Sequence, residues 1–80
     1  MWNVYVIKSK EGFYYWGMTS NLPKRLKKHN SGKSYYTKKG TDWALMYFES
    51  FKTAKEARKR EKYFKNNAGK EWLRRRGIID

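Results

Sequence analysis

The chain has 80 residues, a net charge of +13 and no cysteine. Its length predicts a single domain over residues 1–80, and the lack of cysteine excludes disulfides and thiolate metal sites. A charge this positive steers a protein toward polyanions, with nucleic acid as the first candidate and an anionic membrane as the second. No apolar run approaches the roughly 20 residues of a membrane span, and the first residues lack the basic-then-apolar order of a signal peptide. We therefore expect a cytoplasmic protein that binds nucleic acid and no membrane.

The first part of the chain predicts a β-hairpin followed by a helix. β-branched and aromatic residues at 2–8 and 13–18 predict two strands, which a turn at 9–12 joins. Asn21 is a favourable N-cap, so a helix is expected to begin there and to end near His29.

The next part predicts a strand and a second helix. A basic loop at 33–42 leads into a third strand at 43–50, which is apolar enough to be central. Thr53, with Glu56 three residues later, matches a capping box, and the helix that it opens runs to about Asn66.

The end of the chain predicts a short last helix. A break at 66–69 precedes a helix at 70–76, which Gly77 closes. The element order is β-β-α-β-α-α, and the hairpin implies antiparallel pairing. The expected fold class is therefore α/β (α+β), a small three-stranded antiparallel sheet flanked by helices.

Two ionisable residues of the first helix share its apolar face. Successive helical residues are rotated by about 100°, which places Arg25 and His29 within the arc of Leu22 and Leu26. The other basic residues of this helix fall on the opposite side: Lys24, Lys27 and Lys28. The pattern thus turns an arginine and the only histidine toward the core.

The second helix repeats this arrangement with an acid. Glu61 falls on one stripe with Ala57 and Phe64, whereas Glu56 lies off that stripe and is placed to pair with Arg60. Burying a lone carboxylate is costly unless a partner compensates its charge, so Glu61 needs a reason for its position.

Two interpretations of the inward-facing polar residues remain open. In one, Arg25 and Glu61 form a buried salt bridge and His29 is a hydrogen-bonded core histidine. In the other, the three residues line a cleft beneath a basic rim. Such a cleft suits phosphate chemistry, because a carboxylate binds a divalent cation and an arginine meets phosphoryl charge.

Tyr5 and Tyr15 lie in the paired strands and are either ordinary core aromatics or a source of the base that such chemistry needs. A phenol with a pKa of about 10 is a poor base at neutral pH unless a metal or a positive field lowers that pKa. The charge of this chain supplies such a field.

The stretch VYVIKSKEGFYYWGMTSNLPKRLKKHNSGKSYYTKKG resembles the GIY-YIG nuclease superfamily. It is most similar to the small stand-alone bacterial proteins related to the N-terminal nuclease domain of the excision-repair endonuclease. The resemblance runs from Trp2 to about Arg74. Tyr5 matches the tyrosine of the first motif, and the second motif matches Tyr15, Trp16 and Gly17.

The resemblance implies a metal-dependent catalytic site. The residues that it marks as catalytic are Tyr5, Tyr15, Arg25 and His29. Glu61 matches the metal-binding glutamate, with Mg²⁺ or Mn²⁺ as the implied cofactor, and Gly17 allows a close turn of the chain beside the site. We prefer Tyr15 as the base and Tyr5 as its hydrogen-bonding support, although the sequence does not separate the two.

The chain departs from the family pattern at a few positions. Asn3 and Val4 replace the glycine and isoleucine of the first motif, and Trp16 replaces the isoleucine of the second. Many family members have an asparagine well beyond the metal-binding glutamate. Asn66 and Asn67 come too soon after Glu61 to match it.

Basic residues on and after the first helix are expected to hold a phosphate backbone. They are Lys24, Lys27, Lys28, Lys33, Lys38 and Lys39. Tyr35 and Tyr36 are expected to stack on exposed bases. The alternative for this loop is a solvated basic connector.

The expected function is that of a metal-dependent DNA endonuclease, which hydrolyses phosphodiester bonds. We expect it to act in DNA repair or recombination, and we favour a monomer. An alternative from another class is a non-catalytic DNA- or RNA-binding module on the same scaffold, and a third is a structural partner in a repair complex. Only the nuclease predicts metal dependence that passes through Glu61.

Overall fold

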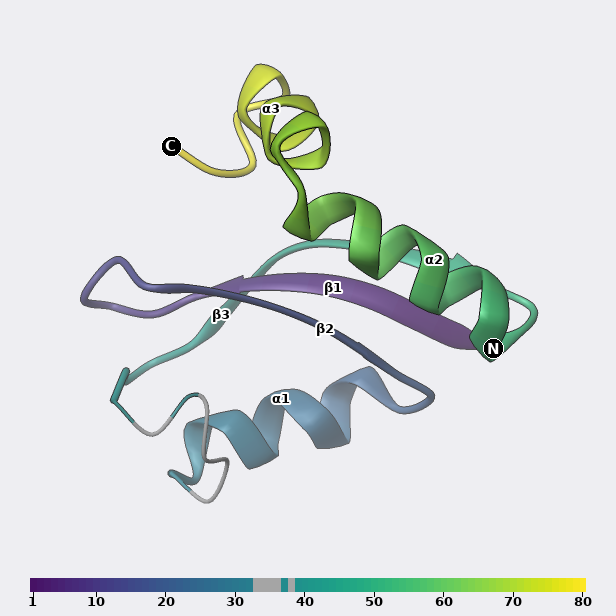
Figure 1. Ribbon diagram of the computed structural model, residues 1–80. Helices are drawn as coiled ribbons and strands as arrows, with labels where there is room; N and C mark the ends of the chain where they lie inside the picture. Colours follow the sequence, from purple (N-terminus) through teal and green to yellow (C-terminus); the bar gives the residue numbers. More distant parts are fainter. Residues whose placement is uncertain (33–36, 38) are drawn as a thin grey trace.

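A three-stranded antiparallel sheet forms the centre of the computed structural model, which describes residues 1–32, 37 and 39–80. The strands are β1 (Trp2–Lys8), β2 (Tyr14–Thr19) and β3 (Ala44–Phe51), in the spatial order β2-β1-β3. Helix α1 (Leu22–Asn30) covers one face of the sheet and α2 (Ala54–Lys65) covers the other (Figure 1). The element order β-β-α-β-α-α and the α+β fold class are confirmed.

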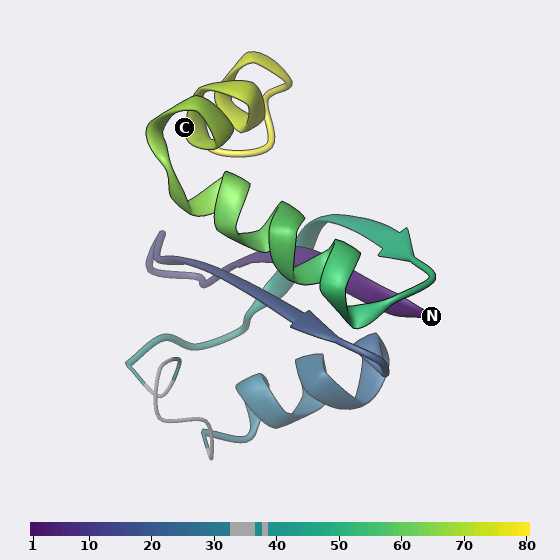
Figure 2. The ribbon, with the colours of Figure 1, turned by 45° about the vertical axis from the view of Figure 1, so that its right-hand side comes forward.

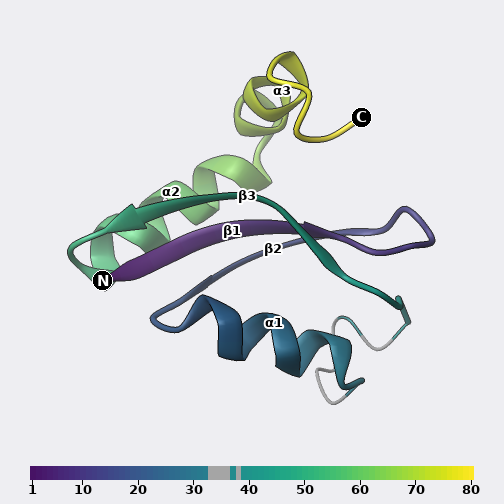
Figure 3. The ribbon, with the colours of Figure 1, turned by 180° about the vertical axis from the view of Figure 1, so that it is seen from behind.

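The expectation that the strand at 43–50 is central is wrong, because β1 pairs on both sides and β3 lies at an edge. Seen from behind, β3 runs along the outside of β1 (Figure 3). Two of its apolar side chains, Met46 and Phe48, are 41% and 51% exposed. An apolar run indicates that both faces of a strand are apolar, but it does not determine the position of that strand in the sheet.

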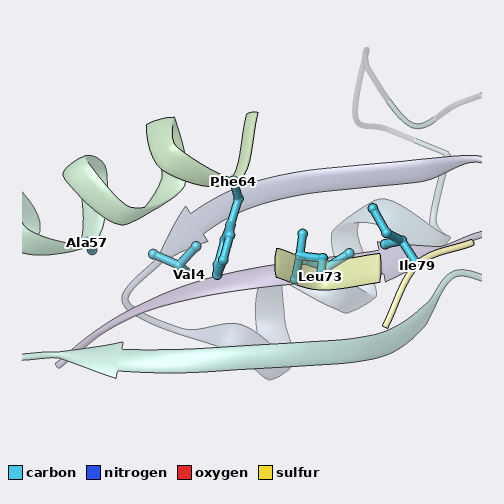
Figure 4. Packing of buried hydrophobic residues seen from close by; sticks show 6 residues of the cluster. Val4, Ala57, Phe64, Leu73 and Ile79 are labelled. Carbon is cyan, nitrogen blue, oxygen red and sulfur yellow. The ribbon is translucent and has the colours of Figure 1, made fainter. Parts of the chain in front are cut away.

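Side-chain alternation divides the core of β1 between the two faces. Val4 and Val6 pack with Ala57 and Phe64, and in Figure 4 the Phe64 ring points from α2 toward Val4. Tyr5 and its same-face neighbours form a second cluster on the α1 side. That cluster contains Tyr5, Ile7 and Trp43, with Tyr15, Leu22 and Leu26 packed against it.

Side-chain caps set where the helices begin. The Asn21 side chain accepts a hydrogen bond from the backbone N–H of Lys24, and the Thr53 side chain accepts one from Glu56, as expected of N-caps. Helix α3 (Asn67–Arg75) begins three residues earlier than expected, because the Asn66 side chain caps it by accepting from the backbone N–H of Gly69.

Gly69 permits the sharp corner between α2 and α3. A Cβ atom at this position would lie 1.8 Å from the backbone oxygen of Tyr63, so only glycine fits this approach of the two helices. The segment at 66–69 that the sequence marks as a break is thus a cap and a first helical turn. None of the helices in the described ranges is long and apolar enough to cross a membrane.

Arg60 links α2 to β3 and α3. Its Nε and Nη2 donate to Glu49 at 2.8 and 3.1 Å, and its guanidinium lies 4.8 Å from the centre of the Trp72 ring. The expected pairing of Arg60 with Glu56 is therefore wrong. The Glu56 carboxylate instead accepts a hydrogen bond from the Thr53 hydroxyl, and the Glu56 backbone N–H donates to that hydroxyl, so the side chain stays at the N-cap.

Candidate active site

Tyr5 and His29 are joined by a hydrogen bond inside the α1 face of the sheet. The Tyr5 hydroxyl lies 2.8 Å from Nε2 of His29, in the last turn of α1, and Nδ1 of the same ring lies 2.9 Å from the Thr37 hydroxyl. All three side chains are essentially inaccessible to solvent. Both ring nitrogens therefore have partners, which a buried imidazole requires.

Burial controls the protonation of Tyr5 and His29. Burial raises the pKa of Tyr5 to about 12, and it outweighs hydrogen bonding to Arg25, which lowers that pKa. Burial also lowers the pKa of His29 to about 4, and the charges of Arg25 and Lys28 lower it further. At neutral pH the phenol is protonated and the imidazole is neutral. The expectation that the positive field lowers the tyrosine pKa is thus wrong for Tyr5.

Tyr15 and Gly17 reach the same face from β2. In the antiparallel register Gly17 lies opposite Tyr5, and Tyr15 lies opposite Ile7, so their Cβ positions point toward α1. The Tyr15 ring centre is 4.9 Å from that of His29 and 6.3 Å from that of Tyr5.

Gly17 is required by the close approach of the two tyrosines. A Cβ atom at residue 17 would lie 2.6 Å from the Tyr5 hydroxyl oxygen and 3.0 Å from Cε2 of Tyr15. Any side chain would displace the phenol, which accounts for glycine in the second motif. Trp16 points to the other face, where it packs against the core beneath α2.

Arg25 joins this group from α1, and the inward face predicted for the helix is the one that the structure shows. Hydrogen bonding to the Tyr5 hydroxyl is the largest cause that raises the pKa of Arg25, and interactions with Tyr15 add to it. The Nε atom of Arg25 is buried and has no hydrogen-bond partner among the described residues. The structure therefore gathers Tyr5, Tyr15, Arg25 and His29 on one face.

Glu61 approaches from the opposite face, on α2, which rests on β1 and β2 (Figure 2). Its side chain is 19% exposed, and its carboxylate forms an ion pair of 3.8 Å with Lys65. No Arg25–Glu61 ion pair occurs among the described residues. The charge of Glu61 is the smallest of the five influences on the pKa of Tyr5.

The donor set fits a metal held by one carboxylate. The described residues contain no group of three or more His, Cys, Asp or Glu side chains that could form a metal cage. Mg²⁺ keeps several waters and is usually bound through one or two carboxylates together with substrate phosphates, and Mn²⁺ accepts the same oxygen ligands. Glu61 is partly exposed and only loosely paired, so its oxygens remain available as such ligands.

Thr37 is a member of this group that sequence analysis missed. It is fully buried, and its backbone oxygen accepts a hydrogen bond from Nε1 of Trp43. In the sequence it sits within a basic loop with no periodic pattern, so no local signal points to it. Asn66, considered above as a late asparagine, caps α3.

The residues predicted to bind nucleic acid are only partly described. Lys24, Lys27, Lys28 and Lys39 are exposed, and the Lys39 ammonium lies 5.0 Å from the centre of the Phe13 ring. Four further predicted residues lie outside the described ranges: Lys33, Tyr35, Tyr36 and Lys38.

Comparison with known proteins points to one family. The family model of the GIY-YIG catalytic domain matches residues 1–75. The chain is 47% identical over 62 residues to the UPF0213 protein YazA of Bacillus subtilis, an alignment that covers 76% of this chain and 63% of that protein. A UPF0213 protein of Clostridium perfringens is 44% identical over 63 residues, which is 78% of this chain and 68% of the relative.

Similar proteins extend beyond bacteria. A UPF0213 protein of Halobacterium salinarum is 40% identical over 62 residues, which is 76% of this chain and 80% of that protein. No solved structure matches significantly. The matched region spans slightly less than two thirds of YazA.

Proposed function

Because this chain belongs to the GIY-YIG family of catalytic domains, which implies a nuclease-type function, we propose that it is a metal-dependent endonuclease that hydrolyses phosphodiester bonds of DNA. The observation that carries the proposal is the convergence of Tyr5, Tyr15, Arg25 and His29 on one face of the sheet. These groups suit phosphoryl chemistry, which requires a positioned water and positive charge beside the phosphate.

Tyr5 holds the site in place in this proposal. Its hydroxyl is protonated at neutral pH and is engaged with His29, while Thr37 fixes the far side of the imidazole. These two hydrogen bonds, from Tyr5 to His29 and from His29 to Thr37, restrict the orientation of both rings. Tyr5 and His29 are therefore assigned to positioning, with Tyr15 as the group that they position.

Tyr15, in its deprotonated form, orients the attacking water and takes one of its protons as the water oxygen bonds to phosphorus. One P–O ester bond of the strand breaks, and the leaving oxygen takes up a proton from solvent. It is less buried than Tyr5, and its ring lies against His29. Proton transfer by a positioned side chain of this kind contributes on the order of 10²–10⁴ in rate.

Arg25 stabilises the negative charge that develops on the phosphoryl oxygens. Interaction with the Tyr5 hydroxyl is the largest cause that raises the pKa of Arg25, so its guanidinium lies beside the tyrosine and stays charged. A preorganised donor in a site that excludes water loses little on reorganisation, and removing one costs on the order of 10²–10³ in rate.

Glu61 would hold the Mg²⁺ or Mn²⁺ ion, which when bound would neutralise phosphate charge and make a water easier to deprotonate. The Glu61 carboxylate supplies oxygen ligands only, as these hard cations prefer. Lys65 would yield its loose ion pair with Glu61 to the metal.

The basic surface would hold the DNA backbone, through the six lysines named above, with Tyr35 and Tyr36 stacking on exposed bases. We further propose a cytoplasmic monomer with a single domain that acts in DNA repair or recombination. Light scattering of the purified protein tests the monomer, and a fluorescent fusion tests the location. A stable dimer or a membrane-bound fusion would contradict these points.

The decisive experiment measures nicking of supercoiled plasmid and of a labelled flap substrate, with Mg²⁺, with Mn²⁺ and with EDTA. Arg25→Ala and Glu61→Gln are expected to lose nicking, whereas Glu71→Gln, which removes the same charge from an exposed position on α3, should retain it. Salt-sensitive binding without cleavage of any substrate would instead indicate a non-catalytic DNA- or RNA-binding module.

A further inference from the structure

A cavity of about 400 Å³ lies between the end of β2 and helix α1. Its lining residues are Thr19, Ser20, Asn21, Lys24, Arg25 and Lys28. Three of the six carry positive charge, and none of them is acidic. Two other cavities of the described part of the chain differ, since one is lined in part by Glu71 and the other by Glu56.

None of the three cations of this cavity forms an ion pair in the described part of the chain. The ion pairs found there use other cations, namely Lys8, Arg60, Lys65, Arg74 and Arg75. The Nε atom of Arg25 is buried without a hydrogen-bond partner in the same part of the chain. Three cations around one cavity repel one another, and a bound anion would relieve that repulsion.

The lysines of α1 fall into two groups around this cavity. Lys24 and Lys28 are four residues apart, so they lie on the same side of the helix, and both line the cavity. Lys27 does not line it and is exposed elsewhere on the helix. The sequence pattern places all three on the polar side of the helix, but only two of them converge.

The cavity adjoins the candidate active site through Arg25, which lines the cavity and also interacts with the Tyr5 hydroxyl. A water molecule takes up about 30 Å³ in the liquid, so the cavity has room for a phosphate group and part of its sugar. The Lys24 and Lys28 ammonium groups suit phosphate as point charges, and Ser20 adds an exposed hydroxyl donor.

We propose that this cavity binds an internal phosphodiester of the substrate strand next to the one that is cleaved. The inference rests on the proposed nuclease function and adds a substrate requirement to it. Cleavage requires a phosphate on the neighbouring nucleotide, and Lys24 and Lys28 hold that phosphate while Arg25 serves the reacting one. Lys27 contributes only general attraction to the polyanion.

The test measures binding in EDTA, so that it does not depend on cleavage. The ¹⁵N-labelled protein is titrated with the thymidine trinucleotide TpTpT, with the 5′-phosphorylated dinucleotide pTpT and with the mononucleotide pT, and amide shifts are followed by NMR. With TpTpT and pTpT, saturable shifts are expected at Ser20, Asn21 and Lys24. Lys24→Gln/Lys28→Gln should weaken TpTpT binding about tenfold, and Lys59→Gln/Lys62→Gln, which removes the same charge from exposed positions on α2, should change it less than about twofold.

The outcomes separate this inference from its alternatives. Equal weakening by Lys59→Gln/Lys62→Gln, or shifts spread over all exposed lysines, would overturn it in favour of general charge attraction. Binding of pTpT and pT without TpTpT would overturn it in favour of a terminal phosphate. Localised TpTpT binding in a protein that never nicks DNA would support the phosphate site and overturn only the nuclease. If nicking occurs, the double variant should raise KM and leave kcat unchanged.

Discussion

The Tyr5 hydroxyl lies 2.8 Å from Nε2 of His29, which ties the central strand of the sheet to the last turn of α1. This contact joins residues 24 positions apart in the chain and is completely buried. It accounts for His29 on the apolar face of α1, because a buried phenol and a buried imidazole satisfy each other.

Removing the Tyr5 hydroxyl should destabilise the fold. In Tyr5→Phe the ring still fills its space, but Nε2 of His29 loses its partner, and leaving a buried polar group unpaired costs about 1–3 kcal/mol. Urea unfolding measures the loss. Tyr14→Phe is the control, because the Tyr14 hydroxyl makes an exposed hydrogen bond with the backbone N–H of Asp80. Equal effects of both substitutions would contradict the prediction.

The stability of the protein should depend on pH through His29. Its pKa falls from an ordinary 6.5 to about 4 in the folded state, chiefly through burial. Within that window the unfolded chain binds a proton that the folded chain does not. The free energy of unfolding should therefore fall as the pH drops, by up to about 1.4 kcal/mol per pH unit.

The measurement is urea unfolding between about pH 5 and pH 7, where the chain has no other histidine to titrate. His29→Gln should flatten the pH dependence, although it will lower the stability itself. The carboxyls with lowered pKa values, Glu11 and Glu49, act at lower pH than this window. The same slope in wild type and variant would rule out His29 as the cause.

Gly17→Ala should disturb the site through Tyr5. The added methyl group would lie 2.6 Å from the Tyr5 hydroxyl, so the phenol must shift, and overpacking of this kind costs about 1–3 kcal/mol. Nicking activity should fall with it. In the double variant Gly17→Ala/Tyr5→Phe the nearest clashing atom is gone. The loss of stability in the double variant should therefore be smaller than the sum of the losses in the two single variants. Simple additivity would show that the methyl group acts elsewhere.

The Arg60–Glu49 pair should stabilise the packing of α2 on β3. Although burial opposes ionisation, hydrogen bonds from Arg60 and Tyr47 hold the pKa of Glu49 below its usual value. Arg60→Met removes two charge-assisted hydrogen bonds and should cost about 2 kcal/mol in thermal or urea unfolding. Arg58→Met, at an exposed position of the same helix, should cost less than about 0.5 kcal/mol. Similar costs at both positions would refute a specific role for the pair.

The sequence by itself determined the features that depend on near neighbours along the chain. The order of elements, the caps at Asn21 and Thr53, and the inward face of Arg25 and His29 all follow from local periodicity and capping chemistry. These patterns are set by backbone geometry within a few residues, so they are readable before any folding is considered. The spacing of the motif residues along the chain likewise indicated the family to which the protein belongs.

Only the tertiary structure decided which distant residues meet. It made β1 the central strand, brought Thr37 to His29, and joined Arg60 to Glu49 rather than to Glu56. It also reversed the expected direction of the Tyr5 pKa, since net charge is known from composition but burial is not. Strand neighbours, burial and convergence of side chains depend on long-range packing, and no period along the chain encodes them.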